Sequence, residues 1–439
     1  MRRRSHSGQA LVVMLAFLGV LTGAFILVFN VGQTVNDKMK LVNAADAAAY
    51  SAALWEARSL NYQAYLNRAI VANEVAIGQL VSLRSWSTYM QRTTRNVNLV
   101  AQWVPPLTVP MRLLAQSWKA VDTGIQRGLP PLEAAISHWN VDVLQNAQGI
   151  AFQQTLISAA NLVSAVARGN EPRAQVTEAT RVLQVRNGAQ WQDQFTARYQ
   201  RGGGDLRRFT DLLMASRDGF TRSRRGDLLP AASPVQVSRR GGTDLIGEYS
   251  WRGVDTVSAH IDLVVTNQEI PIGWGAAEQR HSPITRRGVH GGSLRTNPRA
   301  SRLAQRQLIA QQQYAGVPEI RDVVRPGTRD SRSLLYTVAL QLPRESMLTA
   351  DRLFMPAGLQ QMHGDSISVA PNLAADALHA LGTAELYFQR PFARSDGRRE
   401  YPSLFSPYWQ ARLADTPSSA RTLTAPLRGL AVDPFAVLP

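Results

Sequence analysis

Cysteine is absent from this chain of 439 residues. Disulfide bonds, thiolate metal sites and cysteine nucleophiles are therefore excluded. Lysine is scarce as well, because it occurs only at positions 38, 40 and 119 among 48 basic residues. The arginines that carry the net charge of +16 are scattered in small pairs, without the interleaved aromatic residues of a nucleic-acid platform. We expect these arginines to lie in solvated loops, and we expect no nucleic-acid partner.

Proline is missing from the first quarter of the chain. None precedes Pro105, six lie before residue 200, and seventeen lie from Pro230 onward. Because proline interrupts helix interiors, the first half can be helical and the second half can hold only short helices. The sequence predicts an α+β fold in which a transmembrane helix continues into a long helix. A helical region follows, and then a C-terminal domain with a modest antiparallel sheet and long loops.

Residues 10–29 form an unbroken apolar run that follows three arginines, Arg2, Arg3 and Arg4. Twenty residues of helix rise ~30 Å, which matches the hydrocarbon thickness of a bilayer. The run is longer than the apolar part of a cleaved secretory signal, and no small-residue cleavage site follows it closely. Since positive flanks stay in the cytoplasm, we expect a single-pass membrane protein with a cytoplasmic N-terminus and with the remaining 400-odd residues outside the cytoplasm.

A second interpretation of the N-terminus concerns Gly8 and Gln9. Prepilin-type leaders are short and basic, end in glycine, and are followed at once by an apolar helix, as in this chain. Pilins of that class carry glutamate at the fifth residue after the cut, where this chain has Val13. The missing glutamate argues against a major filament subunit, but processing after Gly8 stays open.

Two sets of small residues predict close contacts between helices. Gly19 and Gly23 form a Gly-x-x-x-Gly pair, which permits close contact of membrane helices but also occurs because glycine is common in spans. Beyond the bilayer, the alanine-rich stretch around Ala45, Asp46 and Ala49 is thin enough for partner helices to approach. Asp46 is either a polar contact in a helix bundle or a solvated side chain. These five residues are our candidates for helix association, and they allow a homo-oligomer through the N-terminal helix.

The remaining patterns divide the chain into segments. Alternating apolar and polar residues predict half-buried strands over 257–263, 334–342 and 384–388, while 273–299 has the composition of a loop. Helical periodicity continues to about Tyr199, a further helix is predicted over 205–217, and Gly78 is a candidate hinge. The predicted divisions are a basic leader (1–8), a transmembrane helix (9–30), a membrane-proximal long helix (31–95), a helical region (96–200), a linker with a short helix (201–244), an α+β domain (245–413) and a C-terminal tail (414–439).

The N-terminal residues also carry a resemblance. The stretch from Gly8 through the apolar run to the signature Asn-Ala-Ala-Asp-Ala-Ala-Ala-Tyr at 43–50 resembles the N-terminal domain of TadE/TadG-like proteins. Those are assembly components of Flp-type (tight-adherence) pili. Segments 387–391 and 404–413 are similar to the distal part of one uncharacterised subgroup. The resemblance implies a bacterial inner-membrane protein of a pilus or adhesin assembly apparatus, with its bulk in the periplasm. Its implied partners are the lipid bilayer and other pilus-assembly membrane proteins.

Motifs that carry chemistry are missing from the sequence. It has no His-Glu-x-x-His run, no phosphate-binding glycine loop and no Gly-x-Ser-x-Gly elbow, and its seven histidines are dispersed. The metal-binding Asp-x-Ser-x-Ser loop of some TadG-like proteins is also unmatched, because the spacing is wrong at Asp330 and Asp365. We therefore expect a non-enzymatic structural protein without metal or cofactor. The alternatives are a minor pseudopilin or surface adhesin processed after Gly8, and a periplasmic enzyme with an unrecognised site.

Overall fold

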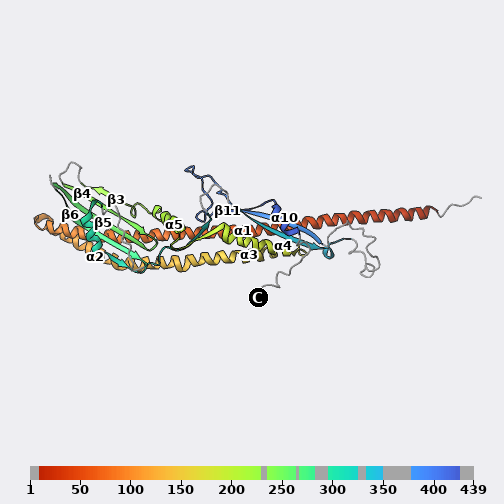
Figure 1. The fold of residues 1–439 in the computed structure, drawn as a ribbon, viewed down its shortest axis with the longest axis horizontal. Helices are drawn as coiled ribbons and strands as arrows, with labels where there is room; N and C mark the ends of the chain where they lie inside the picture. Colours follow the sequence, from red (N-terminus) through yellow and green to blue (C-terminus); the bar gives the residue numbers. More distant parts are fainter. Residues whose placement is uncertain are drawn as a thin grey trace, which may run out of the picture. The chain divides into compact units, whose positions relative to one another are not determined.

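One helix of 93 residues, α1 (Gln9–Ala101), forms the first part of the fold. The computed structural model describes residues 9–228, 235–263, 266–281, 295–324, 333–349 and 377–425. The chain divides into two compact units, and α1 contributes to both (Figure 1). Unit 1 comprises residues 1–62, 152–197 and 323–439, and unit 2 comprises residues 63–151 and 198–322. Each unit is therefore assembled from segments that are distant in the sequence.

Unit 1 packs helices on an antiparallel sheet of four strands, in the order β1-β9-β10-β11. Strands β9 (Leu334–Pro343) and β10 (Ala377–Phe388) pair along ten residues, from Ala377 opposite Pro343 to Leu386 opposite Leu334. The other elements are α3 (Asn146–Asn170), β1 (Gln175–Val176), α4 (Glu178–Ala189), the π-helix η2 (Gln190–Phe195), the 3-10 helix η3 (Arg344–Ser346), β11 (Trp409–Leu413) and α10 (Ser418–Thr424).

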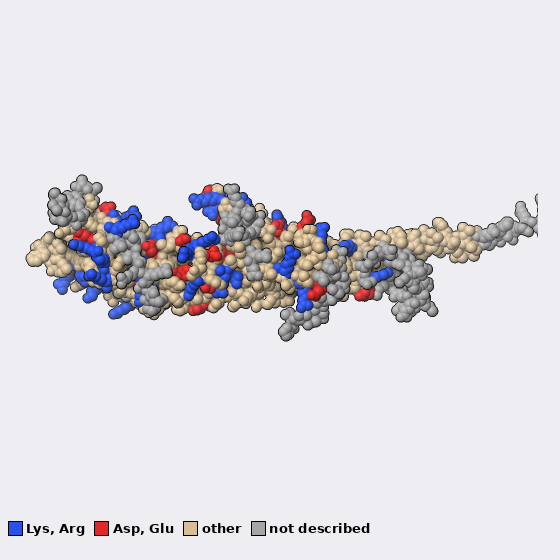
Figure 2. Space-filling view, viewed as in Figure 1, with Lys and Arg blue, Asp and Glu red and all other residues tan. Residues whose placement is uncertain are grey.

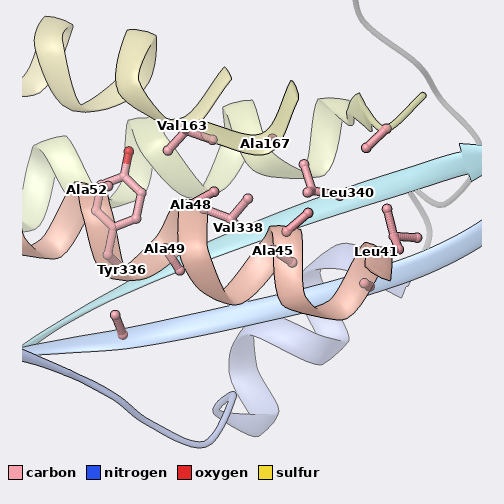
Figure 3. Close-up of a cluster of buried hydrophobic side chains, with 14 of the residues drawn as sticks. Leu41, Ala45, Ala48, Ala49, Ala52, Val163, Ala167, Tyr336, Val338 and Leu340 are labelled. Atoms are coloured by element: carbon pink, nitrogen blue, oxygen red, sulfur yellow. The ribbon is translucent and has the colours of Figure 1, made fainter. Parts of the chain in front are cut away.

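The core of unit 1 is built around alanines of α1. Figure 3 shows α1 in this core together with α3, β9 and β10. Seven residues of α1 in this core are completely buried, namely Leu41, Ala44, Ala45, Ala48, Ala49, Ala52 and Ala53. The cluster also includes Val163 and Ala167 of α3, alternate residues of β9 (Tyr336, Val338, Leu340 and Leu342) and residues of β10 such as Ala380 and Ala384. Because alanine has a short side chain, a helix and a sheet can both approach the axis of α1 closely.

An aromatic cluster extends this core along α1. Trp191 stacks on Phe152 and Phe195 at centroid distances of 5.6 and 6.1 Å, and Trp409 meets Phe195 edge-on at 5.4 Å. Asn61 of α1 fixes β11, because its amide donates to the Trp409 carbonyl at 2.9 Å and accepts from the Trp409 N–H at 2.9 Å. The two bonds hold the edge strand against α1.

Unit 2 contains a five-stranded sheet in the order β3-β4-β5-β6-β7. All pairs are antiparallel except β6–β7. Its strands are β3 (Arg224–Asp227), β4 (Val235–Ile246), β5 (Ser250–Leu263), β6 (Thr266–Arg280) and β7 (Ile309–Gln311). Its helices are α2 (Pro105–His138), the π-helix η1 (Trp139–Gln145), α5 (Gly204–Ala215) and α7 (Pro298–Arg306). Strands β2 (Thr196–Tyr199) and β8 (Ile320–Val323) form a separate two-stranded sheet.

Polar contacts, rather than alanines, fix α1 in unit 2. Completely buried Glu74 accepts hydrogen bonds from the Tyr314 hydroxyl at 2.7 Å, the Asn140 amide at 2.9 Å and the Trp251 indole at 3.1 Å. Arg84 pairs with Glu133 of α2 at 2.9 Å, and both side chains are completely buried. Since buried carboxylates are costly unless they are paired, these contacts specify where β5 and α2 pack on α1.

The α+β fold class and the long N-terminal helix are confirmed, and each predicted strand lies within β5, β9 or β10. Residues 273–280, expected in a loop, belong to β6, so this detail of the sequence interpretation is wrong. The helix expected to run to about Tyr199 continues from α4 through the π-helix η2 to Phe195, and residues 196–199 form β2. The segment 201–244, expected to be a linker with a short helix, contains α5, β3 and the start of β4.

Gly78 is not at an interruption of α1. It lies inside the continuous helix, and a methyl group at its Cα would come within 3.0 Å of the Trp251 ring. The residue leaves room for a tryptophan of β5, and this accounts for a glycine that the sequence offered as a candidate hinge.

Candidate membrane anchor and assembly interface

The apolar run 10–29 forms the first five turns of α1 and is uncovered by the rest of the described chain. Its large side chains are exposed, for example Val20 at 73% and Phe25 at 67%. Figure 2 shows this part of α1 as a surface without charged groups. Its only hydroxyl, on Thr22, donates to the Leu18 carbonyl at 2.8 Å, so no side-chain donor of the run is left unsatisfied. An exposed, uncharged helix of this length has the properties of a transmembrane segment.

Gly19 and Gly23 lie on one face of this exposed helix. Among the described residues, no atom of another part of the chain is within 4 Å of a methyl group built on either glycine. Both positions are therefore open to a neighbouring helix, and their role in lateral association stays a prediction. Gly8 lies outside the described residues, and α1 begins at Gln9.

An ion cluster fixes α1 two turns beyond the apolar run. The Arg173 guanidinium donates to Asp37 at 2.8 Å, to Glu171 at 2.8 Å and to the Ser346 carbonyl at 2.9 Å. Asp37 is completely buried, and its second oxygen accepts from the Leu348 N–H at 3.3 Å. The hydrogen bonds from Arg173 hold the pKa of Glu171 below its usual value, and those to Glu171 and Asp37 raise the pKa of Arg173. This cluster ties α1 to the turn before β1 and to the segment after η3.

The alanine signature is buried within its own chain. Ala45 and Ala49 are completely covered by α3, β9 and β10. In this structure they mediate association of α1 with other elements of unit 1, so neither offers a surface to a second copy. Half-buried Asp46 has a raised pKa, caused by its partial burial. The backbone of Gly382 on β10 lies against Ala45 and Asp46, and a methyl group there would overlap the backbone of both.

Glu56 lies two turns beyond Ala49 on α1 and is completely buried. Neither of its carboxylate oxygens has a hydrogen-bond partner among the described residues. Burial raises the pKa of Glu56 to about 8. The pKa of Tyr336 is raised mainly by its own burial and to a lesser extent by the nearby Glu56. A buried carboxyl without a partner is stable in its neutral form. Nothing in the sequence distinguishes Glu56, because a lone glutamate on a long helix is normally solvated.

A cavity of about 390 Å³ in unit 1 lies beside the membrane-proximal part of α1. Its polar lining consists of Lys38, His379, Arg421 and the three threonines Thr177, Thr416 and Thr424, without a carboxylate. The Lys38 ammonium donates to the His379 carbonyl, so α1 and β10 form two of its walls. Among the described residues, this lining contains no pair of carboxylates of the kind used in general acid–base catalysis.

The histidines and carboxylates do not assemble into a metal site within the described ranges. No three of them lie close enough together to hold a metal ion in that part of the chain. The two Asp-x-Ser loops considered in the sequence, at Asp330 and Asp365, lie outside the described residues. The expectation that the chain binds neither metal nor cofactor stays a prediction.

The Asp37–Arg173–Glu171 cluster could not be predicted from the sequence. Asp37 and Arg173 are 136 positions apart, and no spacing rule links them. Glu171 and Arg173 flank Pro172 at the end of α3, a turn signal that was read only as the boundary between two helices. The sequence signals for this cluster are Glu171, at the turn after α3, and Asp37, an acidic residue close to the apolar run of α1.

The exposed apolar start of α1 and the folded core of unit 1, to which α1 also contributes, define a membrane-anchored α+β protein. By length and composition, two helical stretches could cross a membrane, within 10–101 and 105–170; none of the first apolar segment is buried, and 28% of the second is. Residues 8–56 match the family model of the TadE/G-like Flp pilus-assembly domain. No curated protein and no solved structure matches the chain. The match covers the apolar run, the alanine signature and Glu56, and it supports a role in pilus assembly.

Proposed function

We propose that this chain is a single-pass inner-membrane component of a Flp-type pilus-assembly system, and that it acts as a structural and interaction protein without enzymatic activity. One observation carries the proposal. The segment that matches the pilus-assembly model combines an uncovered apolar helix with a set of buried alanines that pack the helix against unit 1. We call these alanines of α1, at positions 44, 45, 48, 49, 52 and 53, the alanine seam. A protein built in this way holds a folded body at a membrane.

The three N-terminal arginines support a cytoplasmic N-terminus, which would leave the two units in the periplasm. In this arrangement residues 10–29 anchor the chain and pair laterally through Gly19 and Gly23. The Asp37–Arg173–Glu171 cluster then lies close to the outer surface of the inner membrane. The units engage other assembly components through their exposed surfaces, since the alanine seam is already occupied by the chain itself.

Topology is tested with an epitope tag at the C-terminus, in intact cells and in spheroplasts. Protease added to spheroplasts removes the tag if the bulk is periplasmic, while intact cells and a cytoplasmic marker protein stay protected. Arginine at Leu15 and Leu18 should release the protein from the membrane fraction, because each buried charge costs ~2.5–3.5 kcal/mol at the centre of a span. A tag that resists protease in spheroplasts contradicts the proposed orientation.

The mature N-terminus separates the proposal from its closest alternative. Mass spectrometry of the purified protein should find Met1 or its immediate neighbour at the start of a retained anchor. A mature chain that begins at Gln9 supports a minor pseudopilin or surface adhesin, in which the helix leaves the membrane after processing. A pull-down from solubilised membranes with the periplasmic tag, compared with the Leu15→Arg/Leu18→Arg variant, should recover other pilus-assembly membrane proteins only with the anchored form.

A further inference from the structure

A second apolar surface lies at the turn where α1 ends and α2 begins, at one end of unit 2 (Figure 1). We call residues 97–114 the tip. Trp103, in the turn itself, is 87% exposed. Eight further large apolar side chains of the tip are exposed, namely Val97, Leu99, Val100, Val104, Leu107, Val109, Leu113 and Leu114. A helical turn in water normally carries polar residues, so this concentration of apolar side chains marks an interaction surface.

The charges within the helical segments that form the tip have one sign. Residues 75–121 contain no aspartate or glutamate. Arg95 and Arg112 are exposed within or beside the tip, and Lys119 is exposed less than two turns further along α2. Long basic side chains next to apolar residues can extend to a lipid phosphate while their stems lie in an apolar layer.

The backbone N–H groups at the turn of the tip are either absent or hydrogen-bonded within the chain. The first N–H groups of a helix usually lack partners, but the first two positions of α2 are Pro105 and Pro106, which have no N–H. The Leu107 N–H donates to the Val104 carbonyl at 2.9 Å. In the turn, the N–H groups of Trp103 and Val104 donate to Val100 and Ala101 at 3.2 and 3.1 Å. Few polar backbone groups would therefore lose water when the tip is buried.

We propose that the tip inserts into an anionic lipid surface. An exposed tryptophan, apolar neighbours and flanking cations are the composition of segments that lie in a membrane interface. A second copy of the tip would bring the cations of both copies together with no acidic residue of segment 75–121 to offset them, so lipid phosphate is the better complement.

The full-length chain tests this proposal when its anchor is held in nanodiscs of zwitterionic phosphatidylcholine. The loaded nanodiscs are mixed with vesicles that contain phosphatidylglycerol and floated on a density gradient. We expect them to float with these vesicles and to float less with pure phosphatidylcholine vesicles. The Val100→Ser/Trp103→Ser variant should reduce the vesicle affinity about tenfold or more, since it removes two large apolar side chains from the contact. The Arg95→Gln/Arg112→Gln variant should reduce binding to anionic vesicles selectively.

The matched control is Val185→Ser, which replaces an exposed apolar residue of α4 (71% exposed) outside the tip and should leave flotation unchanged. Vesicles with brominated acyl chains should quench tryptophan fluorescence in the unmodified chain, and this quenching should be lost in Trp103→Phe. Three results would overturn the proposal. They are the absence of flotation with anionic vesicles, equal flotation of Val100→Ser/Trp103→Ser, and crosslinking of two nanodisc-held copies through position 103 without vesicles.

Discussion

Gly382 of β10 lies directly against the backbone of Ala45 on α1, with no space between them for a side chain. Gly382→Ala should therefore lower the free energy of unfolding by about 1–3 kcal/mol, because two backbone segments, rather than a flexible side chain, would have to move. Gly226 of β3 is the control, since a methyl group there meets nothing within 4 Å. Chemical denaturation of the full chain in nanodiscs measures both variants. Equal stabilities for Gly382→Ala and Gly226→Ala would contradict the close approach.

A substitution at Ala49 of α1 tests the same close packing on the helix, as Gly382→Ala does on the strand. It is completely buried, so Ala49→Leu forces three extra carbon atoms into a filled space and should destabilise unit 1 by about 1–3 kcal/mol. Ala72, which is exposed on the same helix, should accept leucine with a change within about 0.5 kcal/mol. The same denaturation measurement compares the two. A neutral Ala49→Leu variant would mean that the seam is looser than this packing implies.

The helix and its small residues could be predicted from the sequence, but the elements that cover them could not. Alanine spacing shows that something approaches α1 closely; it does not show that Gly382, more than 300 residues later, is what approaches. Strands with regular alternation, such as β9, were recognised. Strand β6 was missed because Pro271, Gly273 and Gly275 have the composition of a loop.

The glycines of β6 have a packing reason that only the folded structure reveals. A methyl group at Gly275 would overlap the backbone of Ser85 and Tyr89, and one at Gly273 would overlap Thr93. All three contacted residues belong to α1. Glycine in this strand therefore permits the helix to lie on the sheet, and local propensity gives the opposite signal because it does not include that tertiary contact.

Replacing Arg173 should lower the free energy of unfolding more than replacing an exposed arginine such as Arg412. Arg173→Ala leaves buried Asp37 and Glu171 without their main donor, and we expect a loss of about 2–3 kcal/mol in the free energy of unfolding. The control is Arg412→Ala, which breaks the pair between Arg412 and Glu385. The Arg412 side chain is 58% exposed, so its loss should cost less than about 1 kcal/mol. A double-mutant cycle of Arg173→Ala with Asp37→Asn should give a clear coupling energy; additive effects would show that the two residues do not interact.

Glu56 should make unit 1 less stable as the pH rises. Its pKa is raised from 4.5 to about 8 by burial, so between these values the folded chain keeps a proton that the unfolded chain releases. The free energy of unfolding then falls by at most about 1.4 kcal/mol per pH unit over this range, and the contribution of Glu56 is level below pH 4.5. Glu56→Gln removes the titrating group but keeps the shape. The slope measured between pH 5 and pH 8 should be shallower in Glu56→Gln than in the unmodified chain, and parallel slopes would mean that Glu56 ionises freely in the fold.

Gly19, Gly23 and half-buried Asp46 remain candidates for association between copies, since Ala45 and Ala49 are buried within the chain. The double variant Gly19→Ile/Gly23→Ile should weaken lateral crosslinking in the membrane, because side chains on this face keep the helix backbones apart. Insertion should be unchanged, since isoleucine is more apolar than glycine. Ala24→Ile adds similar bulk about 100° around the helix and should leave crosslinking intact. If the double variant crosslinks as efficiently as Ala24→Ile, the glycine face is not a contact between copies, and the exposure of both glycines reflects contact with lipid alone.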